Sequence, residues 1–138
     1  MLSTRLSIKQ FAAAYGVVLL VMALFDAVWL GWLALPFYVR EIGPLMLDAP
    51  KWIPASLFYL LYPLGLVFLA LQVRPQSLAE AALRSAVVGL VAYGVYDLSN
   101  LATLRDWSVK VCMVDMVYGA FASGVAGSLA YRLANRIR

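Results

Sequence analysis

The chain has 138 residues, of which 64% are hydrophobic and only 13% charged, and its formal net charge is +4. Soluble domains are about half apolar and about a quarter charged, so this composition predicts one integral membrane domain spanning residues 1–138. Histidine is absent and Cys112 is the only cysteine. Cys/His zinc sites, Fe–S clusters, His-ligated haem and Ser-His-Asp catalysis are therefore excluded.

The first apolar run predicts a transmembrane helix over residues 8–35. It exceeds the roughly 20 residues that a bilayer requires, so the helix should tilt or protrude. It carries Asp26 and, three residues later, Trp29. Pro36 is expected to end this helix, because proline cannot continue the helical hydrogen-bond pattern.

Residues 37–53 are predicted to form an interfacial loop, in which Tyr38 and Trp52 suit the headgroup level of the membrane. A second helix follows over residues 54–73, with a proline in its first turn where the missing N–H costs nothing. Pro63, in the middle of this run, should kink the helix or leave a backbone carbonyl without its helical hydrogen bond.

Two further helices are predicted over residues 78–104 and 109–131, separated by a short polar turn. Ser77, with Glu80 three residues later, is typical of a capping box at the start of the third helix. The sequence therefore predicts an all-α, up-down-up-down bundle of four transmembrane helices.

The positive charges lie at the ends of the apolar runs rather than in a basic block, which disfavours nucleic-acid binding. Short cytoplasmic loops carry an excess of Lys and Arg, so their distribution indicates orientation. Four of the eleven lie in the two loops remote from the termini. The other seven lie on the side of both termini and predict that it is cytoplasmic: Arg5, Lys9, Arg74, Arg84, Arg132, Arg136 and Arg138.

Three acids lie inside the predicted helices. At a rise of about 1.5 Å per residue, Asp97 lies about 12 Å, Asp115 about 9 Å and Asp26 roughly 13 Å below the same outer surface. Tyr62 falls at a similar depth on the second helix. The candidate ligand- or proton-binding residues are Asp26, Asp97, Asn100, Asp115, Tyr62, Tyr93, Tyr118 and Trp29, with Tyr59 as an additional donor.

Helical spacing groups these residues further. Tyr93, Asp97 and Asn100 follow an i, i+4, i+7 pattern, so they share a face and are expected to be partners. Such polar contacts stabilise membrane helices by about 0.6–2 kcal/mol. A central Asp costs about 2.5–3.5 kcal/mol, which favours a site for a ligand, ion or proton over purely structural bonding. Arg105 and Lys110 either lean inward as counter-charges or extend toward the interface.

Several distinctive stretches lie along the chain: Asp26-x-x-Trp29-Leu30, Leu57–Tyr62, Tyr93–Leu104 (YGVYDLSNLATL), Trp107 and Val114-Asp115. Together they resemble one bacterial membrane family, catalogued as domain of unknown function 2177. In that family Thr often stands at the position of Ser99 and Trp at that of Tyr118, both mild changes. The resemblance implies a bacterial inner-membrane protein. Since the family has no established activity, it implies no catalytic role for any residue.

Three hypotheses remain open from the sequence. The first is an acidic and aromatic pocket in the outer half of the bilayer that binds or moves a cation or small ligand, with or without protons. Its layout is similar in size to the small multidrug transporters, which work as dimers. The second is an enzyme that acts on lipid or isoprenoid through paired carboxylates. The third is an accessory subunit of a larger membrane complex. The sequence names no cofactor and no metal motif, and it leaves the choice between a homodimer and a larger complex open.

Overall fold

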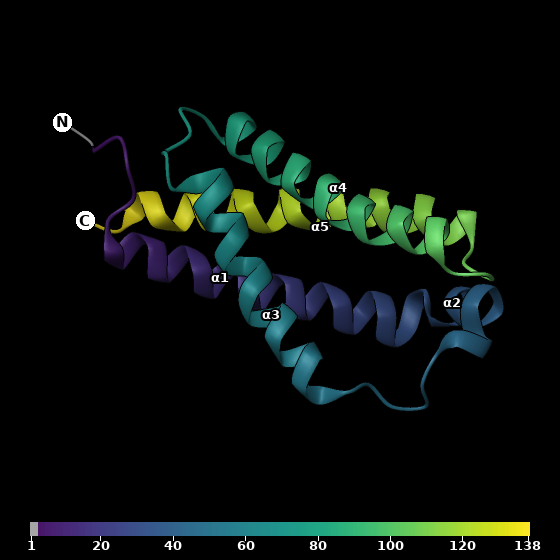
Figure 1. The fold of residues 1–138 in the computed structure, drawn as a ribbon. Coiled ribbons are helices and arrows are strands. Elements are labelled where there is room, and N and C mark those ends of the chain that lie inside the picture. The colour runs from purple at the N-terminus through teal and green to yellow at the C-terminus, as the bar shows by residue number, and fades with distance from the viewer. Residues whose placement is uncertain (1–2) are drawn as a thin grey trace.

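The computed structural model describes residues 3–138. Within that range, four helices are long and apolar enough to span a membrane, and they run in alternating directions (Figure 1). No strand is present there beyond one isolated bridge between Arg5 and Val73. The all-α, four-helix prediction is thus confirmed. The spans are α1 (Ile8–Val28) with the π turn η1 (Trp29–Leu33), α3 (Trp52–Leu66) with the π turn η3 (Val67–Leu71), α4 (Leu78–Thr103) and α5 (Val109–Arg136).

Helix α5 is the central element of the bundle. Half of its most apolar segment is buried inside the protein, against 22% in each of the other three spans. It packs along α4, where glycines let the two backbones approach closely. A Cβ on Gly119 would collide with the Tyr93 ring, and one on Gly89 would collide with the Gly119 carbonyl and Ser123. This close contact brings Asp97 of α4 beside α5.

The end of the first span differs from the prediction. The α-helical hydrogen bonding of α1 gives way to η1, and the chain turns at Ala34. A separate short helix, α2 (Leu35–Ile42), begins at the last residue of the predicted first helix and extends into the predicted interfacial loop. Pro36 lies in the first turn of α2, where the backbone N–H groups have no partner within the helix and the missing N–H of proline therefore costs nothing. Tyr38 on α2 is only 6% exposed, so its side chain packs against the bundle, and its position at the headgroup level stays a prediction.

Helix α3 begins at Trp52, two residues before the predicted start, which places Pro54 in the first turn as expected. The helix continues through Pro63 and widens into the π turn η3 before ending. Figure 1 shows α3 crossing α1 obliquely, with its first turns away from the other long helices.

Both termini lie at the same end of the bundle (Figure 1). The side chain of Gln10 donates a 2.8 Å hydrogen bond to the Ile137 carbonyl. Arg74, in the loop between η3 and α4, donates to Gln10 at 2.8 Å and to Asn135 at 2.9 Å. These contacts tie the ends of α1, η3 and α5 together. The Ser77 hydroxyl caps α4, accepting from the Glu80 backbone N–H at 3.0 Å. The predicted capping box is not completed, because the Glu80 side chain accepts from the backbone N–H of Gln76 rather than that of Ser77.

Candidate functional site

Asp26 joins three helices at the middle of the bundle. Its carboxyl group is buried, with only 6% of the residue exposed. The Tyr59 hydroxyl of α3 donates to Oδ2 at 2.5 Å, and the Tyr118 hydroxyl of α5 donates to Oδ1 at 2.7 Å. Each oxygen of Asp26 therefore has a tyrosine donor, and both tyrosines were anticipated from the sequence.

Asp115 is held from the short helix α2. The Tyr38 hydroxyl donates a short hydrogen bond to Asp115 Oδ1 and accepts one from Trp29 Nε1 at 3.2 Å. Burial, and next the hydrogen bond to Asp115, raises the pKa of Tyr38 above its ordinary value. Tyr38 therefore keeps its proton at neutral pH and acts as a donor to the carboxyl group. This contact places α2 across the ends of α1 and α5.

Asp97 is the unusual member of the cluster. It is fully buried, at 0% exposure, and neither of its carboxyl oxygens has a hydrogen-bond partner among residues 3–138. Its closest acidic neighbour is Asp115, whose carboxyl group lies beside it between α4 and α5. Two ionised carboxylates are both acceptors, so a hydrogen bond between them requires a proton on one.

Two groups near Asp97 were not anticipated. The Cys112 thiol donates a 3.4 Å hydrogen bond to the Asp97 backbone carbonyl. The Trp107 indole N–H is buried near the Asp97 side chain, yet it too has no hydrogen-bond partner in the described part of the chain. Asp97 therefore lies near an N–H donor, the Trp107 indole, without forming a hydrogen bond to it in this structure.

Basic side chains do not neutralise these acids. Lys110 is 78% exposed, and its ammonium lies 3.8 Å from the Glu41 carboxylate, outside the cluster. Arg105 is also exposed. The ion pairs found within residues 3–138 include none of Asp26, Asp97 and Asp115. The hypothesis that Arg105 and Lys110 lean inward as counter-charges is therefore wrong, because both extend away from the bundle.

The predicted partners of Asp97 on its own helix are not its partners. Within the described residues, no hydrogen bond joins Asp97 to Tyr93 or Asn100. The Asp97 carboxyl group instead lies beside Asp115 of α5. The Tyr93 ring packs edge to face on Tyr118, with centroids 6.3 Å apart. Asn100 lies half-buried in the following turns of the helix.

Tyr62 also stands apart from the carboxyl groups. Its hydroxyl lies 2.6 Å from the Ser123 hydroxyl of α5. Helix α3 therefore reaches the cluster through Tyr59, one turn earlier than Tyr62.

Tyr38 is the site residue that sequence reasoning missed. The available signal was the four-residue spacing of Ala34 and Tyr38 across Pro36, which is the period of a helix with one buried face. Ala34 and Tyr38 are both buried in the structure.

Comparison with known proteins identifies the family. A family model described as "Predicted membrane protein (DUF2177)" matches residues 11–132, from the first turn of α1 to the last turn of α5. The chain belongs to this family. The match includes every candidate site residue, as the resemblance in the sequence indicated. No curated protein and no solved structure matches the chain.

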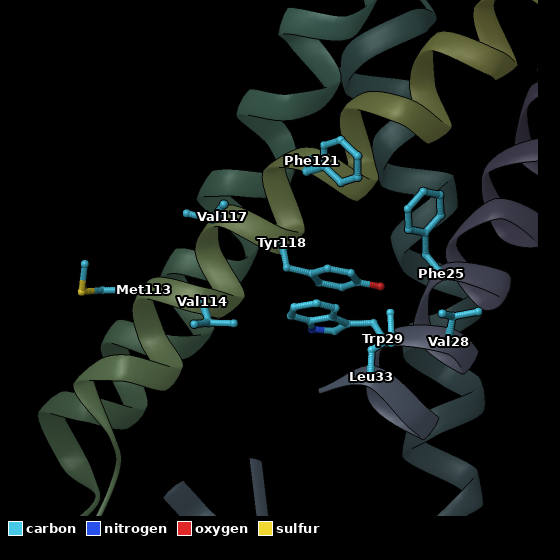
Figure 2. Close-up of a pocket in the computed structure, with 9 residues that line it drawn as sticks. All are labelled: Phe25, Val28, Trp29, Leu33, Met113, Val114, Val117, Tyr118 and Phe121. Atoms are coloured by element: carbon cyan, nitrogen blue, oxygen red, sulfur yellow. The ribbon is translucent and has the colours of Figure 1, made fainter. Parts of the chain in front are cut away.

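An apolar groove lies on this DUF2177 protein beside the Asp26 cluster, between α1 and α5 (Figure 2). Its volume is about 660 Å³, and its walls include Phe25, Val117 and Phe121. The rings of Trp29 and Tyr118 stack at 5.0 Å and 8° along the groove. Figure 2 shows the Tyr118 hydroxyl turned toward α1, where it meets Asp26. Tyr118 therefore lines the groove with its ring and contacts the carboxyl group with its hydroxyl.

The three acids of this DUF2177 chain do not converge on one point. Within residues 3–138, no group of three acidic, cysteine or histidine side chains is arranged to hold a metal ion. Asp26 with its two tyrosines forms one part of the site, and Asp97 with Asp115 forms the other. Trp29 links them, because it bonds to Tyr38 on one side and stacks on Tyr118 on the other. The available chemistry is proton exchange and the binding of a donor or cation.

Proposed function

We propose that this protein is a multi-pass component of the bacterial inner membrane, with both termini cytoplasmic, that binds or moves a cation in exchange for protons. The site is the buried carboxyl cluster in the outer half of the bilayer. The observation that carries the proposal is Asp97, which is fully buried beside Asp115 without a hydrogen-bond partner.

The energetic cost of Asp97 supports a binding role. An ionised Asp at the centre of a membrane helix costs about 2.5–3.5 kcal/mol. The usual compensation is a basic partner or several donors, and Asp97 has neither within the described residues. A proton shared with Asp115 removes one charge and supplies the missing donor. An arriving cation provides the same neutralisation, and the displaced proton leaves to water.

The surroundings of the pair support exchange rather than permanent bonding. Asp115 has one fixed donor, Tyr38, whereas Asp97 has none. No side-chain or backbone N–H or O–H group of residues 3–138 therefore donates to the Asp97 carboxyl oxygens in this structure. Intramembrane acids with this character mark proton and ion pathways in pumps and transporters.

Infrared spectroscopy of the full chain in lipid nanodiscs tests the proposal. A protonated carboxyl group has its own C=O stretching band, which carboxylates and amides lack. At neutral pH the wild type is expected to show this band, and Asp97→Asn and Asp115→Asn should each reduce it. Addition of sodium, potassium or tetraphenylphosphonium chloride should reduce the band in the wild type for at least one of the three cations. A spectrum without the band, or one that no cation alters, contradicts proton-linked binding.

The apolar groove supports a second candidate, an enzyme that acts on lipid or isoprenoid with the carboxyl groups as acid and base. A groove open to the bilayer suits such a substrate. Turnover of the host membrane's lipids or polyprenols by purified protein, lost in Asp97→Asn and Asp26→Asn, would favour this candidate over cation binding.

A further inference from the structure

We infer that the cation is lipophilic: its apolar part lies in the groove between α1 and α5, and its charge lies against Asp26. This inference rests on the proposed function and names the class of ligand that the site takes. The inference depends on the groove and on the contacts of Asp26, whereas the proposed function depends on Asp97 and Asp115.

The groove has the size and position for such a ligand. Its volume of about 660 Å³ falls within the range of about 300–1,000 Å³ typical of small-molecule sites. Val117 is 70% exposed and Phe121 61% exposed, so the groove opens on the surface that α5 presents to the membrane. A molecule dissolved in the bilayer therefore reaches the groove without crossing the bundle.

Tyr118 connects the groove to the negative charge. Its ring forms part of the groove wall in a stack with Trp29, and its hydroxyl donates to Asp26 Oδ1 at 2.7 Å. A rotation of the Tyr118 side chain would open Asp26 to the groove and cost that hydrogen bond. A positive charge compensates for the loss, whereas an anion does not. Aromatic faces also attract cations, most strongly when water is excluded.

Charge distinguishes this ligand from an ordinary acyl chain. A lipid tail fills the groove equally well, but it gains nothing from Asp26 and leaves the Tyr118 hydrogen bond in place. Asp26 has tyrosine donors and no basic partner among the described residues. The groove and the acid together are complementary to a molecule that is apolar over most of its surface and positively charged at one point.

Binding of two ions of matched shape and opposite charge tests the inference. Labelled tetraphenylphosphonium and tetraphenylborate are titrated onto the full chain in phosphatidylcholine nanodiscs, with empty nanodiscs as the background. Saturable binding of tetraphenylphosphonium alone is expected. Asp26→Asn should weaken it at least tenfold.

Two groove variants and one control locate the ligand. Val117→Trp and Leu33→Trp add bulk to opposite walls of the groove, and each should weaken tetraphenylphosphonium binding at least tenfold. Val95→Trp on α4 is the matched control, because Val95 is 65% exposed against 70% for Val117 and does not line the groove. It should bind like the wild type. Thermal melting of each variant establishes that it is folded.

The outcomes separate this inference from the proposed function. Equal binding of both ions, or wild-type affinity in both groove variants, overturns the lipophilic cation. If sodium or potassium lowers the protonated-carboxyl band while tetraphenylphosphonium does not bind, the inference fails and the proposed function stands. If tetraphenylphosphonium binds in the groove without changing that band, the ligand class is right and the link to protons is wrong.

Discussion

Replacement of Asp97 by asparagine is the most informative change in this protein. Asparagine has nearly the same shape as aspartate, and its amide is able to donate to the Asp115 carboxyl group beside it. The variant thus supplies permanently the hydrogen bond that the wild type makes only when the pair holds a proton. It also removes an ionisable group from a fully buried position.

The expected effect on stability is small and favourable. A hydrogen bond between membrane helices is worth about 0.6 kcal/mol on average, with a maximum near 1.7 kcal/mol. On the proposed function, a proton shared between Asp97 and Asp115 avoids most of the cost of an ionised Asp in the wild type. We therefore expect Asp97→Asn to stabilise the fold by about 0–1 kcal/mol. The Tm in detergent, followed by circular dichroism, should stay level or rise by a few degrees, while cations should no longer change the protonated-carboxyl band.

Asp97→Leu provides the contrast. Leucine is bulkier than aspartate and cannot accept or donate a hydrogen bond, and the site is completely buried. Overpacking of this kind costs typically about 1–3 kcal/mol. The loss does not come from Tyr93 or Asn100, which are not bonded to Asp97. A Tm for Asp97→Asn that falls as far as that of Asp97→Leu would refute the reasoning, since it would mean that the carboxylate itself stabilises the bundle.

Three further predictions test other parts of the structure. Tyr38→Phe removes the donor to Asp115 and should destabilise the protein by about 1–3 kcal/mol, seen as a lower Tm; an unchanged Tm would show that α2 does not anchor the acid. Gly119→Ala places a methyl group against the Tyr93 ring and should cost about 1–3 kcal/mol, whereas Gly16→Ala, which meets no neighbouring atom, should leave the Tm unchanged. A reporter active only in the periplasm should be silent when fused to the C-terminus, and strong activity there would reverse the predicted orientation.

The sequence predicted the helices well because apolar runs of sufficient length have few alternatives to spanning a membrane. It named Asp26, Tyr59 and Tyr118 as candidate site residues, but it did not pair Asp26 with these two tyrosines, because depth along a helix does not determine which side chains meet. The predicted partners of Asp97 were wrong, because the spacing of residues along α4 shows which of them share a face but not which helix packs against that face. The role of Tyr38 at the site was not predicted, because α2 is too short for its pattern of buried residues to be distinguished from that of a loop.

The hydrogen bonds of Asp26 form only as the helices that carry its donors are synthesised. Its donors Tyr59 and Tyr118 follow it by 33 and 92 positions. At a synthesis rate of about 5–20 residues per second, the second donor is made roughly 5–18 s after the acid. During that interval the first hairpin holds Asp26 with at most one of its two tyrosine donors. Helix α5 is synthesised after the other three spans and is the most buried of them, so α1 acquires its final contacts only when α5 packs against it.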